Sequence, residues 1–154
     1  VPTIGDGGRS IWGSNSAVRY LSAKYAAGTL GPNDPGARSE ADRWMDWQLS
    51  TISEPMRIAF WGLVRTPPEK RDLKAIEEAR RKCAELLAIP DQALANRPYF
   101  AGNSLTIGDI PLGCHVQLWM RLPIERPAHP NLQRWFDRLC ARPAFKKIVD
   151  IPLS

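Results

Sequence analysis

The sequence predicts a mainly α-helical fold in which a small ββα unit precedes an all-helical part. Three observations support this prediction. Two short runs of strand-forming residues flank a Gly-Gly pair near the start of the chain. A stretch rich in glycine and proline follows at residues 26–36. Beyond it, apolar residues recur every three or four positions in several segments, which is typical of amphipathic helices.

Residues 3–12 are expected to form a β-hairpin. Thr3 to Asp6 is a short strand that ends at Gly7-Gly8, and Arg9 to Trp12 is the return strand. Two consecutive glycines supply the positive φ angles that a two-residue hairpin turn requires. Because an isolated hairpin is only marginally stable in water, it needs further strands or a covering layer.

A helix is predicted directly after the hairpin, and residues 13–16 (Gly-Ser-Asn-Ser) offer several capping side chains at its start. Its apolar residues recur at helical spacing: Ala17, Val18, Leu21 and Tyr25. Residues 26–36 then hold three glycines and two prolines, which is typical of a loop. We therefore predict a first part at residues 1–27, a linker at 28–36 and a helical part at 37–154.

The first long helix is predicted from Pro35 or Ala37 to Gly62. Pro55 removes one backbone hydrogen bond and clashes with the carbonyl group of Thr51, so we expect the helix to bend there without ending. The apolar residues of this helix fall close to helical spacing: Ala41, Trp44, Met45, Leu49, Ile52, Met56, Ala59, Phe60 and Leu63.

A second long helix is predicted from Asp72 to Ile89. Pro90 should kink or end it, although Gln92 to Ala95 could continue it. Its inner face is expected to consist of Leu73, Ile76, Ala79, Cys83, Leu86 and Leu87.

Thr106 and Asp109 have the spacing of a capping box, in which the threonine oxygen accepts from the third helical N–H and the carboxylate reaches back to the cap N–H. A helix is therefore predicted to begin here and to continue to Leu122. His115 on this helix is expected to be packed or half-exposed. A short helix marked by Leu132, Trp135, Phe136 and Leu139 follows, and residues 142–145 begin a last turn or helix.

Composition limits the classes of function. The 154 residues, 44% of them hydrophobic, suit one globular domain or one domain plus a piece. No apolar run reaches the length of a membrane span, so no membrane partner is expected. The net charge of +5 comes mainly from scattered arginines, which does not favour nucleic-acid binding.

The three cysteines, Cys83, Cys114 and Cys140, are odd in number and widely spaced. This pattern fits a reducing compartment, consistent with a cytoplasmic location, and argues against a disulfide framework. Neither these cysteines nor the two histidines, His115 and His129, have zinc-site spacing, so no metal is expected.

The chain resembles the bacterial-type cytosolic glutathione transferases along essentially its whole length. In the first part the resemblance rests on Val1-Pro2, the Asp6-Gly7-Gly8 turn, and the helix that opens at Ser14. In the second part it rests on Arg97 to Gly102 followed by Thr106-Ile-Gly-Asp-Ile, which is similar to the folding box of the family. The family often has alanine where this chain has Gly108, and that difference implies a small local loss of helix stability.

The resemblance implies the C-terminal ββα half of a thioredoxin-like domain followed by the all-helical domain of the family. It implies that glutathione binds as a substrate at Val1, Pro2, Gly13 and Ser14. The peptide bond before Pro2 would be cis, Val1 would pair with the cysteinyl part, and Ser14 would take the γ-glutamyl carboxylate. Free N–H groups and partial positive charge at a helix start favour such a carboxylate.

The first long helix of the family lines both the dimer interface and the pocket for the hydrophobic co-substrate. The resemblance therefore implies a homodimer, and a small hydrophobic electrophile as the second substrate. We assign Trp44 to packing and regard Trp47 and Trp61 as candidates for the co-substrate pocket. The competing interpretation is that the tryptophans of such a helix pack in the core or in a subunit contact.

The resemblance also implies that the βαβ unit expected before the hairpin is missing from this chain. The family's thiol-activating residue lies in that unit, so no residue here is assigned as catalytic and the 154-residue chain is expected to be inactive. Gly13 stands where the family usually has Glu or Asp. This departure favours the alternative function, a transferase-like interaction or assembly module without catalysis.

Overall fold

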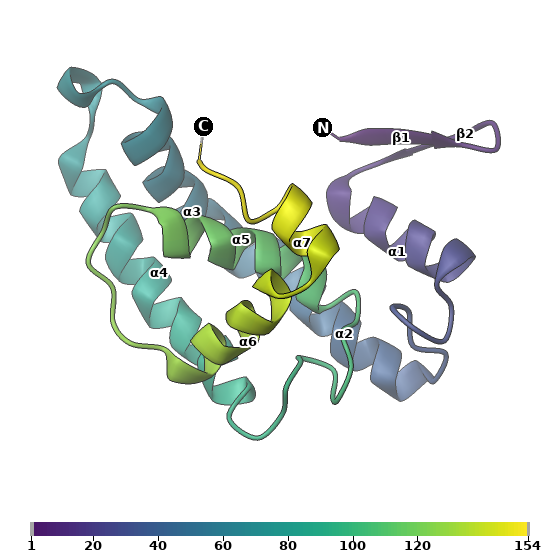
Figure 1. The fold of residues 1–154 in the computed structure, drawn as a ribbon. Helices are drawn as coiled ribbons and strands as arrows, with labels where there is room; N and C mark the ends of the chain where they lie inside the picture. The colour runs from purple at the N-terminus through teal and green to yellow at the C-terminus, as the bar shows by residue number, and fades with distance from the viewer. Residues whose placement is uncertain (1, 154) are drawn as a thin grey trace.

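The structure, a computed structural model, describes residues 2–153. Figure 1 shows a hairpin and one helix beside a larger helical body. The elements are β1 (Thr3–Asp6), β2 (Arg9–Trp12), α1 (Ser14–Tyr25), α2 (Pro35–Trp47), the π-helical η1 (Gln48–Ile52), α3 (Ser53–Phe60), the π-helical η2 (Trp61–Arg65), the 3-10 turn η3 (Pro68–Lys70), α4 (Leu73–Ala93), α5 (Asp109–Arg121), α6 (Pro130–Cys140) and α7 (Pro143–Ile148). The predicted fold class, a ββα unit followed by helices, is confirmed.

The hairpin forms as predicted. Thr3 pairs with Trp12 and Asp6 with Arg9 in an antiparallel register. Gly7 and Gly8 both have positive φ, 56° and 78°, which side chains disfavour and which the two-residue turn requires. The strands therefore close into a two-stranded sheet within the described residues.

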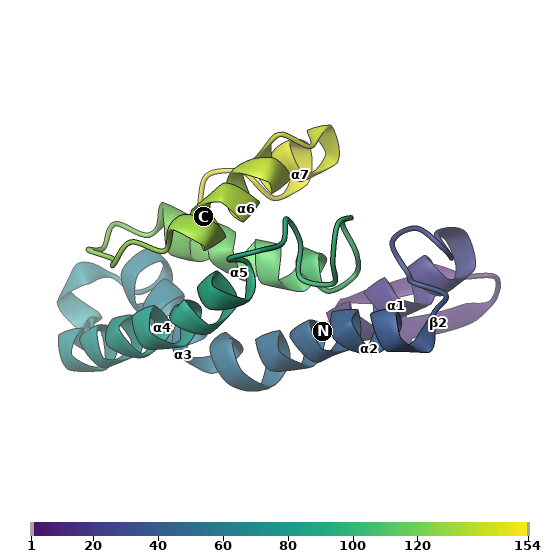
Figure 2. The same cartoon turned by 90° about the horizontal axis from the view of Figure 1, so that it is seen from below.

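Ion pairs hold α1 against its neighbours. The Asp6 carboxylate accepts hydrogen bonds from Lys24 Nζ at 2.8 Å, Tyr25 Oη at 2.7 Å and Tyr20 Oη at 3.0 Å, which fasten the hairpin to α1. The bond from Lys24 lowers the pKa of Asp6. Arg19 on α1 bonds two carboxylates of α2, and Figure 2 shows these two helices side by side.

The first long helix is longer than predicted and runs as α2, η1, α3 and η2 from Pro35 to Arg65. It continues through Pro55, as expected. The π-helical turn η1 lies just before this proline, and both features are known causes of bends in helices. Leu49 falls close to the helical spacing of the other apolar residues, but it is 61% exposed. The π turn changes the angular step between residues, and Gln48 faces the interior instead.

The helix α4 continues to Ala93 with the buried Pro90 inside it, so the predicted possibility of continuation is correct. Leu73 does not belong to its inner face. It is 70% exposed in the first turn. One turn later Ile76 packs closely against Gly62 of η2, where a Cβ atom would lie only 2.5 Å from the isoleucine Cγ1.

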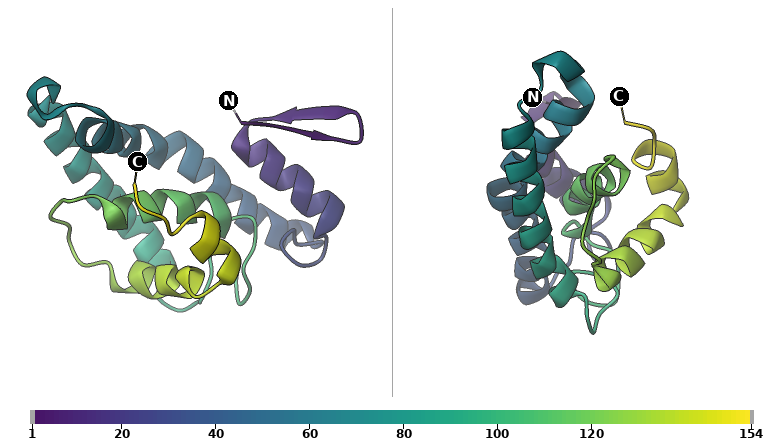
Figure 3. Two further views of the ribbon diagram at one scale, coloured as in Figure 1. Left: turned by 45° about the horizontal axis from the view of Figure 1, so that its top comes forward. Right: turned by 90° about the vertical axis from the view of Figure 1, so that its left-hand side faces the viewer.

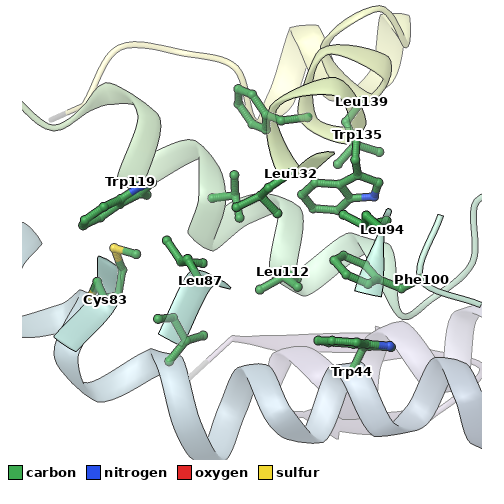
Figure 4. Packing of buried hydrophobic residues seen from close by; sticks show 14 of the residues in the cluster. Trp44, Cys83, Leu87, Leu94, Phe100, Leu112, Trp119, Leu132, Trp135 and Leu139 are labelled. Atoms are coloured by element: carbon green, nitrogen blue, oxygen red, sulfur yellow. The ribbon is translucent and has the colours of Figure 1, made fainter. Parts of the chain in front are cut away.

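The core is a stack of aromatic rings between these helices. The ring centroids of Trp44 and Phe100 are 4.4 Å apart, and those of Phe100 and Trp135 are 4.9 Å apart. Figure 4 shows this stack beside a second group around Trp119. The assignment of Trp44 to packing is therefore correct. The core also contains Ile52, Met56, Ala59, Ala79, Cys83, Leu87, Leu94, Leu112, Val116, Leu122, Leu132, Phe136 and Leu139.

Asp109 begins α5 and is fully buried. Its carboxylate accepts from the Thr106 N–H at 2.9 Å, as the capping box predicts. The threonine hydroxyl differs from the prediction, because it accepts from the Gly108 N–H at 3.3 Å and not from the third N–H. The Asp109 N–H instead bonds the Thr106 carbonyl group at 3.1 Å.

The loop between α1 and α2 is attached to the start of α5. The Ile107 N–H donates to the Leu30 carbonyl oxygen at 2.9 Å.

No helix within residues 2–153 is both long enough and apolar enough to cross a bilayer. Cys83, Cys114 and Cys140 are free thiols in the structure.

Candidate functional site

The start of α1 lies beside the start of β1. The Gly13 N–H donates to the Pro2 carbonyl oxygen at 3.0 Å, which brings together two of the segments predicted to bind glutathione. Gly13 occupies the N-cap position with φ of 86° and ψ of 123°. Only glycine adopts this backbone without strain, so an acid at this position would require a different turn.

Ser14 is the first residue of α1, and its side chain is exposed. Among the described residues no side chain caps this helix, so the prediction of a capping side chain is wrong. The first N–H groups of any α-helix lack acceptors within the helix. Without a cap or an acidic residue in this turn, the start of α1 presents these N–H groups and the positive end of the helix dipole.

Val1, the remaining residue predicted to bind glutathione, lies outside the described residues. The predicted cis peptide bond joins Val1 to Pro2 and therefore also lies outside them.

Two buried amide side chains lie behind the start of α1. Asn15 is 6% exposed, and its Nδ2 donates to the Met45 carbonyl oxygen at 2.9 Å and to Gln48 Oε1 at 3.2 Å. Gln48 is 4% exposed and reaches Ser53 and His115. Sequence analysis missed these residues, because neither apolar periodicity nor spacing marks a polar side chain as buried.

An apolar groove runs between the long helix, α5 and the last residues of the chain. Its volume is about 420 Å³. Phe60 and Leu118 contribute apolar wall, and Cys114 and His115 lie beside them. Residues 148–153 close one side of it, where Gln117 Nε2 donates to the Ile151 carbonyl oxygen at 2.8 Å. Figure 3 shows this end of the chain lying along α5.

Burial determines the protonation of the titratable groups in this groove. Burial lowers the pKa of His115, although a hydrogen bond to the Pro111 carbonyl group opposes the effect. His115 is partly buried, which agrees with the prediction of a packed or half-exposed histidine. Burial also raises the pKa of the Cys114 thiol. Both groups are therefore neutral near pH 7, and the groove has little charge of its own.

The two tryptophans predicted for the co-substrate pocket lie apart from the lining of this groove. Trp47 is half-buried and meets Trp44 edge to face, with ring centroids 5.7 Å apart. Trp61 is 54% exposed, and the Arg65 guanidinium lies 6.0 Å from its ring centroid. Their role in a pocket stays a prediction.

The described residues include no group of three or more His, Cys, Asp or Glu side chains placed to hold a metal ion. The arrangement therefore offers a helix start suited to a carboxylate and an apolar groove.

Comparison with known proteins identifies the family. Residues 52–143 match the model of the glutathione S-transferase C-terminal domain. Glutathione S-transferase GstB of Escherichia coli K12 is 41% identical over 144 residues, which cover 94% of this chain and 69% of GstB. The chain belongs to the glutathione S-transferase family.

Solved structures of transferases agree with this assignment. The theta class glutathione S-transferase of Xanthomonas axonopodis pv. citri, with glutathione bound, superposes with a TM-score of 0.96 at 47% identity. The superposition covers 100% of this chain and 74% of that one. Elongation factor 1-gamma of Danio rerio is also similar, at 26% identity over 94% of this chain and 32% of its own length. Sequence similarity to this chain is therefore found both in proteins named glutathione S-transferase and in an elongation factor 1-gamma.

Proposed function

We propose that the intact protein is a glutathione transferase, which joins the thiol of glutathione to a small apolar electrophile. The observation that carries the proposal is the hydrogen bond from Gly13 to Pro2, which sets the uncapped start of α1 beside the first strand. A family member 47% identical to this chain has been solved with glutathione bound.

Each part of the proposed glutathione site has a physical role. The hydroxyl group of Ser14 and the free N–H groups of the first turn would bind the γ-glutamyl carboxylate, which the helix dipole also favours. The backbone of Val1, before Pro2, would pair with the cysteinyl part. Gly13 supplies no carboxylate of its own, so its contribution is the shape of the turn.

The reaction follows from these positions. The glutathione sulfur, as the thiolate, attacks the electrophilic atom and forms the new bond to sulfur. A leaving group departs with its electron pair, or an addition product takes up a proton, and the thiol proton passes to solvent. A site that lowers the thiol pKa and holds both reactants close supplies the acceleration. We propose the groove beside His115 for the electrophile, and Trp47 and Trp61 as further candidates.

We assign no catalytic residue within residues 1–154, and we propose that these residues alone do not conjugate glutathione. The described sheet has two strands, and the chain spans 69% of GstB and 74% of the Xanthomonas transferase. Conjugation of 1-chloro-2,4-dinitrobenzene by the 154-residue chain would contradict this part of the proposal.

Calorimetric titration of the intact protein with glutathione tests the proposed site. Ser14→Ala should raise the dissociation constant at least about tenfold, because a hydrogen bond to a charged group contributes roughly 1.5–3 kcal/mol and each 1.4 kcal/mol is tenfold. Ser104→Ala, at another exposed serine, serves as the matched control and should leave binding unchanged. Equal binding by the protein with Ser14 and by Ser14→Ala would refute the assignment of Ser14.

The second candidate function is a non-catalytic interaction module. Gly13 and the similarity to an elongation factor 1-gamma favour it. In that case the folded intact protein would not be retained on immobilised glutathione.

We further propose a cytoplasmic homodimer. The free cysteines suit a reducing compartment, and the long helix exposes Leu49 and Trp61. Sedimentation of the intact protein at micromolar concentration would reveal its oligomeric state.

A further inference from the structure

Four side chains form a continuous hydrogen-bonded chain through the interior, and it begins at Asn15. Its Nδ2 group has two hydrogens, and both are used, one by the Met45 carbonyl group and one by Gln48 Oε1. The first turn of α1 is thereby fixed to the end of α2 and to η1. Residues 33 positions apart in the sequence are joined by the bond between Asn15 and Gln48.

The direction of the remaining bonds follows from the chemistry of the donors. Ser53 Oγ donates its single hydrogen to the main-chain carbonyl oxygen of Gln48 at 2.9 Å. Ser53 Oγ therefore accepts from the side-chain Nε2 of Gln48 at 2.8 Å. The second Nε2 hydrogen of Gln48 faces the His115 ring, and both ring nitrogens lie 3.3 Å from Gln48 Nε2. His115 Nδ1 lies 3.3 Å from the Pro111 carbonyl oxygen, which only accepts. In the tautomer that donates this hydrogen from Nδ1, His115 Nε2 is an acceptor, and it lies 3.3 Å from Gln48 Nε2 and 3.2 Å from Ser53 Oγ.

The two ends of this series of hydrogen bonds, Asn15 and His115, lie at the two parts of the proposed site. Asn15 directly follows Ser14, which we propose to bind the glutathione carboxylate. His115 lines the apolar groove together with Phe60 and Leu118. Gln48 lies between them as the first residue of the π-helical turn η1, and π-helical turns occur frequently at functional sites.

The burial of the amide groups of Asn15 and Gln48 requires a reason. A buried amide group that lacks partners is destabilising, and an apolar side chain of the same size avoids that risk. A network in which each donor has an acceptor fixes one geometry of the segments that it joins. The segments joined here are the start of α1, η1 and the groove wall on α5.

We infer that Gln48 is a positioning residue for glutathione transfer. Through Asn15 it fixes the turn of α1 that holds the proposed glutathione site, and through His115 it connects that turn to the wall of the groove. This inference rests on the proposed function.

Two substitutions separate positioning from simple stability. Gln48→Met has a similar length and loses every bond of the amide group, so the dissociation constant of glutathione should rise at least fivefold. Gln48→Glu keeps an acceptor for Asn15, so binding should return to within about twofold of the unaltered protein. Gln92→Met, at an exposed glutamine of α4, is the matched control and should bind normally.

A spectroscopic measurement tests the other end. In Gln48→Glu a carboxylate replaces the amide beside the His115 ring, so the imidazole should titrate at a higher pH than in the unaltered protein when followed by NMR. If Gln48 contributed to stability alone, Gln48→Met would lower the melting temperature. The glutathione affinity, measured well below the melting temperature, would then be unchanged, and Gln48→Glu would have no loss of affinity to restore.

The outcomes are distinguishable. If the unaltered intact protein does not bind glutathione, the proposed function fails, and the positioning role fails with it, while the His115 titration still reports on the contact. If the unaltered protein binds glutathione and folded Gln48→Met binds it equally well, the inference is overturned and the proposed function stands. If Gln48→Met does not fold, an unchanged His115 titration in Gln48→Glu overturns the inference.

Discussion

The buried carboxylate of Asp109 joins three segments of the helical part. It accepts from the Phe100 N–H at 3.1 Å, from Thr106 and from Trp135 Nε1 at 2.8 Å. Burial raises its pKa even though all these donors oppose the shift. The carboxylate therefore acts in structure, as the folding-box resemblance implies.

Asp109→Ala leaves these buried donors without an acceptor, and each unsatisfied group costs about 1–3 kcal/mol. We expect the free energy of unfolding to fall by about 3 kcal/mol or more, measured by urea denaturation. Asp137→Ala, at an exposed position on α6, is the control and should change it by less than about 0.5 kcal/mol. Equal losses in the two variants would show that the buried bonds contribute little.

His115 predicts a dependence of stability on pH. Its pKa is lower in the folded protein than its ordinary value of 6.5. Between the folded pKa and 6.5, the unfolded chain binds more protons than the folded one, so its contribution to stability is complete above pH 6.5 and is lost as the pH falls through this window. His115→Gln should flatten the decrease in melting temperature between pH 7 and pH 5. Parallel curves for the two proteins would contradict the shift.

Among the secondary-structure elements, α2 and α5 approach each other closely at one glycine. A Cβ atom on Gly108 would lie 2.8 Å from the Ala41 carbonyl oxygen and 3.0 Å from its Cα. Sequence analysis treated Gly108 as a small loss of helix propensity, and this interpretation is wrong because the backbone of α2 leaves no room for a side chain.

Gly108→Ala should therefore destabilise the protein, although alanine improves helix propensity by up to about 1 kcal/mol. We expect a net loss of about 1–3 kcal/mol, because a well-packed contact has to shift. Gly5→Ala is the control, since a Cβ atom there meets nothing within 4 Å. A higher melting temperature for Gly108→Ala in calorimetry would refute the close contact.

Local sequence patterns predict some of the secondary-structure elements and their contacts but not others. The turn at Gly7-Gly8 and the helix that begins at Ser14 depend on neighbouring residues, so local patterns predicted them. The bond between Asn15 and Gln48 joins helices that periodicity treats separately. The π-helical turn η1 also departs from the 3.6-residue period, and Leu49 in this turn is exposed although it falls close to the spacing of the other apolar residues. The site's apolar groove depends on packing between distant segments and could not be predicted from them singly.

At the scale of the whole molecule, we expect local stability to differ between the hairpin and the helical part. The hairpin is a two-stranded sheet whose residues are exposed or only partly buried, whereas α5 contains seven buried residues. Local opening is easiest where few apolar contacts hold a segment. In the 154-residue chain the amides of residues 3–12 should exchange with deuterium much faster than those of α5, as measured by mass spectrometry. Comparable protection in both segments would contradict this expectation.

The attachment of Leu30 to Ile107 has a consequence for the integrity of the protein. The connecting segment is fastened at its middle to the second part, while Arg19 and Asn15 fasten α1 independently. A protease that cuts the peptide chain between α1 and Leu30 would therefore leave the hairpin and α1 in place, bound without a covalent link. The hairpin with α1 and the rest of the chain, expressed as two separate polypeptides, should associate through the same contacts of Arg19 and Asn15.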